Sequence, residues 1–171
     1  GTHGSGGLGT FLLGNHSRRM IDEANKPLLL IPKSASIKPI KKVAFATDFK
    51  HPDKDLKVIY ELIPLLRPLN AELLITHIYN EKNHTPAFKK WIEQFLVDLS
   101  NKADYPNIYY RIVKSDKAER GLDWLCDHGQ VDILAMVHRE QNFIQKIITG
   151  SHTKKMADRI NIPLLVLQDN S

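Results

Sequence analysis

The stretch "VDILAMVH" at residues 131–138 is short and nearly all apolar, so it predicts a strand that is buried on both faces. A second run, "PLLVLQ" at residues 163–168, has the same character. Strands that are apolar throughout are typical of parallel sheets with helices packed on both faces. These two runs therefore predict an α/β fold.

Working outward from them, the chain from residue 40 alternates between strand-like and helix-like periods, which predicts the order β-α-β-α-β-α-β-α-β. Thr85 is the expected N-cap of one helix, because a proline follows it. The predicted fold class is a doubly wound, five-stranded parallel sheet in a three-layer sandwich, with ligands at the carboxyl ends of the strands. The predicted strands lie at residues 41–49, 71–79, 107–115, 131–138 and 163–168, and the main helices at 52–69, 85–103 and 117–129.

Two distant segments repeat each other. Residues 14–32 read "GNHSRRMIDEANKPLLLIP" and residues 150–168 read "GSHTKKMADRINIPLLVLQ", with eight identities in 19 positions at a constant offset of 136. Such a repeat indicates two copies of one structural unit. We therefore expect residues 1–32 to be the last loop, helix and strand of a first domain, 33–39 to be a linker, and 40–168 to be a complete second domain. A tag-derived origin of the first few residues is the alternative.

The glycine-rich start, "GTHGSGGLGTFLLGNHS", resembles the nucleotide-binding loop of the universal stress protein family. Gly1, Gly4 and Gly14 fall on the three glycines of that loop, and Asn15 stands where the family usually has Ser or Thr. The run "KKVAFATDF" is similar to the family's first strand, whose terminal aspartate matches Asp48, and "PLLVL" is similar to its fifth strand.

The resemblance implies a tandem-type universal stress protein with a truncated first domain and a Rossmann-like or flavodoxin-like fold of the adenine nucleotide alpha hydrolase kind. Family members pair through the fifth strand, and some bind ATP while others do not. We therefore expect a homodimer, with the N-terminal fragment strand pairing with the fifth strand within the chain or across the dimer. The strands concerned are Leu164, Leu165, Val166 and Leu167, and Leu28, Leu29, Leu30 and Ile31.

The resemblance divides the nucleotide-binding parts between the two copies. In the second copy the first two loop glycines are replaced by Val137 and Glu140 or, with a one-residue gap, by Met136 and Arg139. Side chains at positions that require bare backbone predict a loss of tight ATP binding. The candidate binding residues are Thr47, Asp48, Arg139, Gly150 and Ser151, together with the first-copy loop residues Gly1, Gly4, Gly14 and Asn15, which lack a strand-one aspartate of their own.

The resulting functional hypothesis is a non-catalytic stress-response module that dimerises through its fifth strands. The alternative is an ATP-binding signalling module or slow ATPase that uses Asp48 and the helix start at Gly150 and Ser151. Two further alternatives stay open. The first-copy glycine loop could meet Asp48 of another molecule, or the chain could be a flavodoxin-like cofactor domain.

The composition argues against nucleic-acid-binding, membrane-spanning and metal-binding proteins. The net charge is +5, but the basic residues are spread along the chain among 19 acidic ones, so we expect no nucleic-acid partner. The apolar runs are too short to span a membrane, and the single cysteine, Cys126, fits a cytoplasmic setting. No metal-ligand spacing is recognised among the eight histidines. Trp91 and Trp124 lie on apolar helix faces and are expected in the core.

Overall fold

The structure is a computed structural model that describes residues 20–21, 23–32, 35–36, 38–82, 84–139 and 161–169. The chain divides into two compact units. One unit comprises residues 1–39 and 133–171, and the other comprises residues 40–132. Strands and helices alternate from β2 to β5, and parallel ladders outnumber antiparallel ones, so the predicted α/β class is confirmed. The helix predicted between the last two strands lies outside the described residues.

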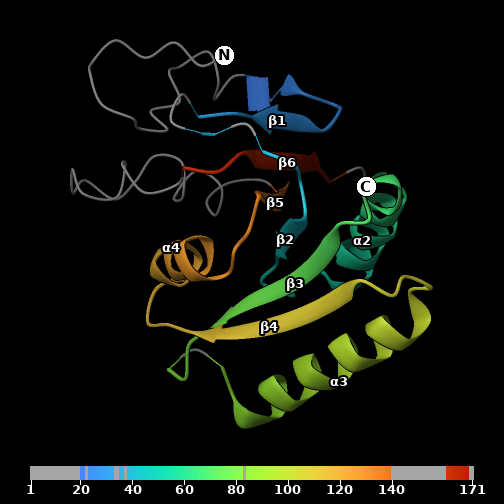
Figure 1. The fold of residues 1–171 in the computed structure, drawn as a ribbon. Coiled ribbons are helices and arrows are strands. Elements are labelled where there is room, and N and C mark those ends of the chain that lie inside the picture. The colour runs from blue at the N-terminus through green and yellow to red at the C-terminus, as the bar shows by residue number, and fades with distance from the viewer. Residues whose placement is uncertain are drawn as a thin grey trace. The chain divides into compact units, whose positions relative to one another are not determined.

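The unit of residues 40–132 contains three parallel strands in the order β2-β3-β4 (Figure 1). Val43 of β2 pairs with Leu73 of β3, which in turn pairs with Ile108 of β4. The predicted strands lie within a few residues of the observed ones. Their bounds are β2 Lys42–Ala46, β3 Glu72–Tyr79 and β4 Ile108–Lys114.

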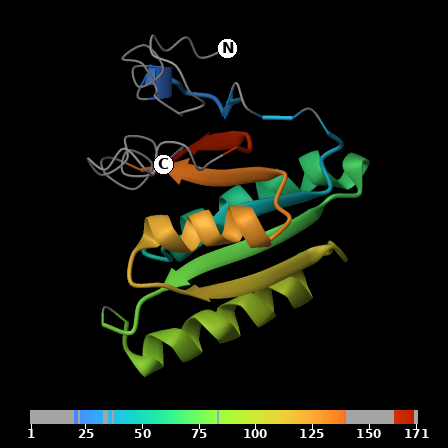
Figure 2. The ribbon, with the colours of Figure 1, turned by 60° about the vertical axis from the view of Figure 1, so that its left-hand side comes forward.

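Three helices cover this part of the sheet: α2 Pro52–Leu66, α3 Pro86–Lys102 and α4 Ala118–His128. Figure 2 shows α4 in front of the strands and α2 behind them. Side chains alternate between the two faces of a strand. His77 of β3 contacts Phe88 of α3, whereas the next residue, Ile78, lies against Gly121 of α4. Helices α3 and α4 therefore also pack on opposite faces.

The helix ends follow the local sequence. The Thr85 hydroxyl accepts a hydrogen bond from the Phe88 backbone N–H at 3.2 Å, so the predicted N-cap of α3 is confirmed. Pro64 lies in the last turn of α2, which passes into the short 3₁₀ helix η1, Arg67–Leu69. The η1 turn then leads into β3, and the buried Tyr105 hydroxyl, ahead of β4, donates to the Ala71 carbonyl.

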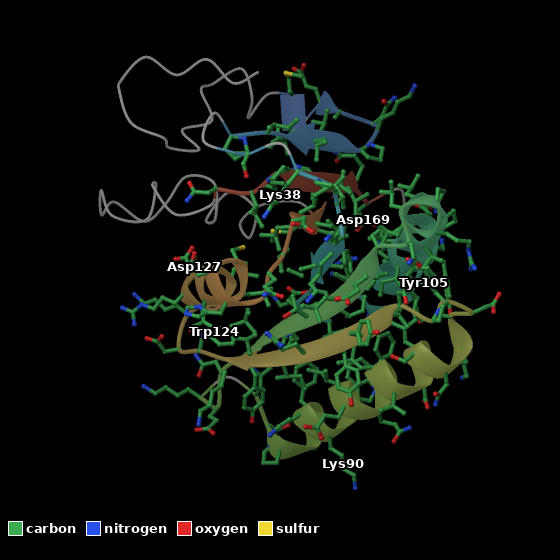
Figure 3. The ribbon with its side chains drawn as sticks, viewed as in Figure 1. Lys38, Lys90, Tyr105, Trp124, Asp127 and Asp169 are labelled. Atoms are coloured by element: carbon green, nitrogen blue, oxygen red, sulfur yellow. The ribbon has the colours of Figure 1, made fainter. Side chains whose placement is uncertain are left out.

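The expected burial of the two tryptophans is wrong. Trp91 is 41% exposed and Trp124 is 45% exposed (Figure 3 shows Trp124 on α4). The buried line of α3 consists of Ile92, Leu96 and Leu99, and Trp91 lies to one side of it. A periodic pattern identifies the apolar half of a helix, but it does not separate the centre of that half from its flank.

The unit that holds residues 20–32 and 133–139 with 161–169 contains β1 Leu28–Leu30, β5 Ile133–His138 and β6 Leu164–Gln168. Strand β6 lies between the other two, parallel to β5 and antiparallel to β1. The expected pairing of the fragment strand with the fifth strand is thus confirmed in its in-chain form. Among the described residues, it adds an antiparallel strand to the five that the pattern predicted.

We expect Gly121→Ala to destabilise the fold by about 1–2 kcal/mol, although alanine favours helices over glycine by about 1 kcal/mol. A Cβ at this position would lie 2.6 Å from the Ile78 Cγ2 atom, so β3 and α4 would have to separate. Urea unfolding measures the loss. The same substitution in an Ile78→Ala background has room for its methyl group and should be stabilising; an equal loss in both backgrounds would contradict the close contact.

Candidate functional site

The candidate site lies in the unit of residues 40–132, where strands β2 and β3 end. Thr47 and Asp48, which the sequence prediction placed at the end of the 41–49 strand, follow β2 directly. His77 and Tyr79 are among the last residues of the neighbouring strand β3. Carboxyl ends of parallel strands are where α/β folds place their ligands, so the geometry here decides what the unit can bind.

Thr47 is a structural junction. Its hydroxyl donates to the Asp55 carboxylate at 2.6 Å and accepts from the Phe49 backbone N–H at 2.9 Å. Its own N–H donates to the Thr76 carbonyl across the strands. Thr47 is 8% exposed and Asp55, in the first turn of α2, is completely buried. The hydroxyl is therefore committed to joining β2 to α2, because a buried carboxylate requires donors.

Asp48 points the other way, toward solvent. Its Oδ1 accepts from the Lys50 backbone N–H at 3.1 Å, and its Oδ2 lies 3.3 Å from the Lys50 ammonium. The Asp48 side chain is 40% exposed and that of Lys50 is 76% exposed. An ion pair this exposed contributes little stability. Both carboxylate oxygens are thus engaged by one neighbouring residue, in a turn that a ligand could open at small cost.

Phe49 adopts an unusual backbone conformation. Its φ of 55° lies in the left-handed region, which is a genuine outlier for a bulky residue and costs about 1–3 kcal/mol. The turn nevertheless places the ring in the interior, 3% exposed, with its centroid 5.3 Å from that of Phe95 and 5.5 Å from that of His77. The ring packing and the bond from Phe49 N–H to the Thr47 hydroxyl offset the strain.

A row of stacked rings runs from the end of β3 along α3, beside Phe49. We call it the aromatic row; successive centroids are 5.0–5.8 Å apart and the ring planes are tilted by no more than 27°. The sequence prediction did not include this row, although spacings of three and four residues along a helix were the available signal. Its members are Tyr79, His84, Phe88, Trp91 and Phe95.

His77 lies beneath this row and is 2% exposed. Its Nδ1 is 2.9 Å from the Thr47 carbonyl oxygen, and a carbonyl can only accept, so Nδ1 carries the proton. The neutral ring then presents a lone pair at Nε2, which is buried and has no hydrogen-bond partner among the described residues. Burial lowers the pKa of His77, and nearby His84 lowers it further; the Thr47 hydrogen bond and Asp48 oppose this.

The other predicted site residues belong to the other unit or fall outside the described residues. Arg139 follows β5 in the other unit, where its Nε lies 3.3 Å from Asp169. Met136, one of the residues aligned with a loop glycine, is a buried member of β5. The remaining candidates fall outside the described residues: Gly1, Gly4, Gly14, Asn15, Gly150 and Ser151, as does Glu140.

The cysteine and the possible metal ligands of the described residues do not form a further reactive site. Burial raises the pKa of the Cys126 thiol to about 12, with Asp123 and Asp127 adding to the shift, so the thiolate nucleophile is scarce at neutral pH. Within the described ranges, no group of three or more His, Cys, Asp or Glu could hold a metal ion. The helices described are all too short or too polar to cross a membrane.

Comparison with known proteins reveals similarity in structure only. No protein-family model and no curated protein sequence matches the chain. A universal stress protein from Archaeoglobus fulgidus DSM 4304 matches at a TM-score of 0.67 and 16% identity, over 99% of this chain and 60% of its own. A universal stress protein in complex with cAMP matches at 0.54 and 20% identity, over 76% of this chain and 98% of its own.

A third structure, the universal stress protein from Archaeoglobus fulgidus in complex with dAMP, matches at a TM-score of 0.57 and 12% identity, over 76% of this chain and 99% of that one. The chain has the fold of universal stress proteins. It spans about 60% of the DSM 4304 protein's length. The resemblance seen in the sequence is thereby confirmed at the level of the fold.

We expect the free energy of unfolding to decrease as the pH is lowered, because of His77. Its folded-state pKa is lowered, so the unfolded chain binds the proton more readily, and stability present above the unfolded value of 6.5 is lost as pH falls below it. Urea unfolding between about pH 7.5 and 5.5 should show a loss of up to about 1.4 kcal/mol per pH unit from this residue. The control is His77→Gln, which keeps a donor for the Thr47 carbonyl but does not titrate. Equal losses in both proteins would contradict the prediction.

Proposed function

We propose that the chain is a stress-response module of the universal stress protein type that acts by binding and assembly and catalyses no reaction. The main support is that Thr47 and Asp48 already bond to neighbouring residues of the site. Thr47 is bonded to Asp55 and Phe49, and Asp48 is held by Lys50. A catalytic site needs a group that is poised toward a substrate and has a pKa near the working pH. Thr47 and Asp48 are instead held by neighbouring residues, and the lone pair of His77 Nε2 is buried.

A cytoplasmic location belongs to the same proposal. The one cysteine of the chain is compatible with a reducing compartment.

Adenine nucleotide binding is the second candidate function, and two of the similar structures favour it. Two proteins of this fold are described in complex with cAMP and dAMP. The Asp48 carboxylate, 40% exposed, is the group that would accept hydrogen bonds from a ribose or base. Against tight binding of ATP stand the bulky residues in place of the loop glycines, Met136 and Arg139 or Val137 and Glu140. We therefore propose that any nucleotide is held weakly, at Asp48.

Isothermal titration with Mg-ATP, cAMP and dAMP tests this assignment. We expect a dissociation constant no tighter than roughly 100 μM for ATP, because Asp48 is left to act with few phosphate-binding amides. Asp48→Asn keeps the shape of the turn and removes the charge, so it serves as the matched variant. Micromolar ATP binding that Asp48→Asn abolishes would replace the non-catalytic module with the ATP-binding module or slow ATPase, which phosphate release would then separate.

The strand pair β1–β6 supports assembly through the fifth strand. Leu29 lies opposite Leu165, with Leu28 opposite Val166 and Leu30 opposite Leu164. The repeat offset of 136 makes Leu29 and Leu165 equivalent positions. An antiparallel pair centred on equivalent residues has the local two-fold symmetry of an isologous dimer contact. We propose that the chain makes this contact within itself, and that a homodimer forms when two chains exchange β1.

Cysteines at the centre of the pair distinguish the two arrangements. In a Cys126→Ser background, the double variant Leu29→Cys with Leu165→Cys places two thiols on directly opposite residues, at Cα separations of about 4.5–5.5 Å that a disulfide can bridge. Oxidation of a dilute sample should give a cross-linked monomer, and oxidation after concentration should add a covalent dimer, both resolved on a non-reducing gel. A cross-linked monomer alone at every concentration would argue against the exchanged homodimer.

A further inference from the structure

Strand β4 is the outer strand of its unit. All seven of its residues pair with β3, and within the described part of residues 40–132 it pairs with no other strand (Figures 1 and 2). Such a strand presents a row of unpaired backbone groups that can template another strand. The question is which strand it fits.

Three hydrogen bonds show which backbone groups of β4 face outward. The Asn107 carbonyl accepts from Leu73, the Ser115 N–H donates to Tyr79, and the Arg111 carbonyl accepts from the Thr76 hydroxyl. The odd-numbered residues therefore direct their backbone groups toward β3. In a parallel ladder the alternate residues direct theirs away from it. The outward groups belong to Ile108, Tyr110, Ile112 and Lys114.

The exposed side chains of this edge are aromatic and basic. Tyr109 is 49% exposed, Tyr110 is 45% exposed, and Arg111 beside them is also exposed. The Arg111 guanidinium lies 6.0 Å from the centroid of the Trp124 ring, itself 45% exposed on α4. Residues 108–114 contain no acidic residue, proline or glycine to blunt the edge. A partner strand should therefore offer aromatic and aliphatic groups at the centre and a group that accepts Arg111.

We propose that this partner is β4 of a second copy of the chain, paired antiparallel about a two-fold axis at Tyr110. In this register Tyr110 lies opposite the partner's Tyr110, Ile108 opposite the partner's Ile112, and Tyr109 opposite the partner's Arg111. Ile108, Tyr110 and Ile112 then lie opposite residues that also have outward backbone groups, so these central pairs exchange both N–H···O=C bonds. Aromatic and aliphatic pairs directly opposite each other are stabilising in antiparallel sheets.

Alternative registers are less favourable. An axis at Arg111 would place two guanidinium groups directly opposite each other, which is destabilising. An axis at Ile112 would place Tyr110 opposite the partner's Lys114. The axis at Tyr110 instead lets each Arg111 lie between the Trp124 of its own chain and the partner's Tyr109, where both ring faces attract the cation. This contact uses neither β1 nor β6, so it is independent of the exchange dimer proposed above.

Two opposite charges at one position test the register. In the proposed dimer, Tyr109→Lys places an ammonium opposite the partner's Arg111 twice, and Tyr109→Glu places a carboxylate there twice. We expect the first to raise the dimer dissociation constant about tenfold and the second to leave it unchanged or lower it, as measured by sedimentation velocity over a concentration series. Tyr60→Lys, at a 44% exposed position on α2, is the control and should have no effect. A wild-type chain that stays monomeric throughout, or an equal weakening by both Tyr109 variants, would overturn the proposal.

Cross-linking tests the axis directly. In the Cys126→Ser background, Tyr110→Cys brings two copies of the new thiol opposite each other at a Cα separation of about 5.5 Å, within disulfide range. Oxidation should give a covalent dimer. Ile112→Cys, whose thiol would lie opposite the partner's Ile108, should give little. Efficient cross-linking of the Ile112 variant, with little for the Tyr110 variant, would show that this register is wrong.

Discussion

The hydrogen bond between the Thr47 hydroxyl and the Asp55 carboxylate holds the candidate site together. It joins the end of β2 to the first turn of α2 at a point where the carboxylate is completely buried. The same hydroxyl holds the Phe49 N–H, and the Thr47 carbonyl fixes the tautomer of His77. Because a buried carboxylate without donors is costly, these contacts form as a set. The turn at Phe49 and the packing beneath the aromatic row both depend on that set.

This arrangement separates two neighbouring residues that the sequence presents as one motif. Thr47 faces inward and serves the fold, whereas Asp48 faces outward and, among the described residues, is held by Lys50. Asp48 is therefore the residue whose substitution can change binding without unfolding the chain. The pKa of His77, lowered by burial, keeps a neutral ring at the centre of the site near neutral pH. The site accordingly holds a neutral imidazole and the buried Asp55 carboxylate inside, and it presents the Asp48 carboxylate to solvent.

Sequence periodicity predicted the order of strands and helices because burial of apolar side chains dominates both periods. The buried position of Asp55 could also have been predicted from the sequence pattern. It shares a helix face with Ile59, Leu62 and Leu66, all buried, and an acid on such a face signals a buried partner. The left-handed turn at Phe49 could not be predicted, since no glycine or asparagine marks it and the ring contacts that offset its strain come from a distant helix. Likewise, the exposure of Trp91 depends on tertiary packing.

Strand edges connect the fold to assembly. The outer edge of β6 is satisfied within the chain by β1, an antiparallel strand whose register repeats the symmetry of a dimer contact. The edge of β4 has no such strand in the described residues of its unit, yet it carries exposed tyrosines on regular, bulge-free backbone. Lys114, which could blunt that edge, is drawn instead to Glu81 at 2.6 Å, beyond the end of β3. An edge whose charge is diverted in this way, and whose centre is self-complementary in one register, favours pairing with its own copy over pairing with arbitrary strands.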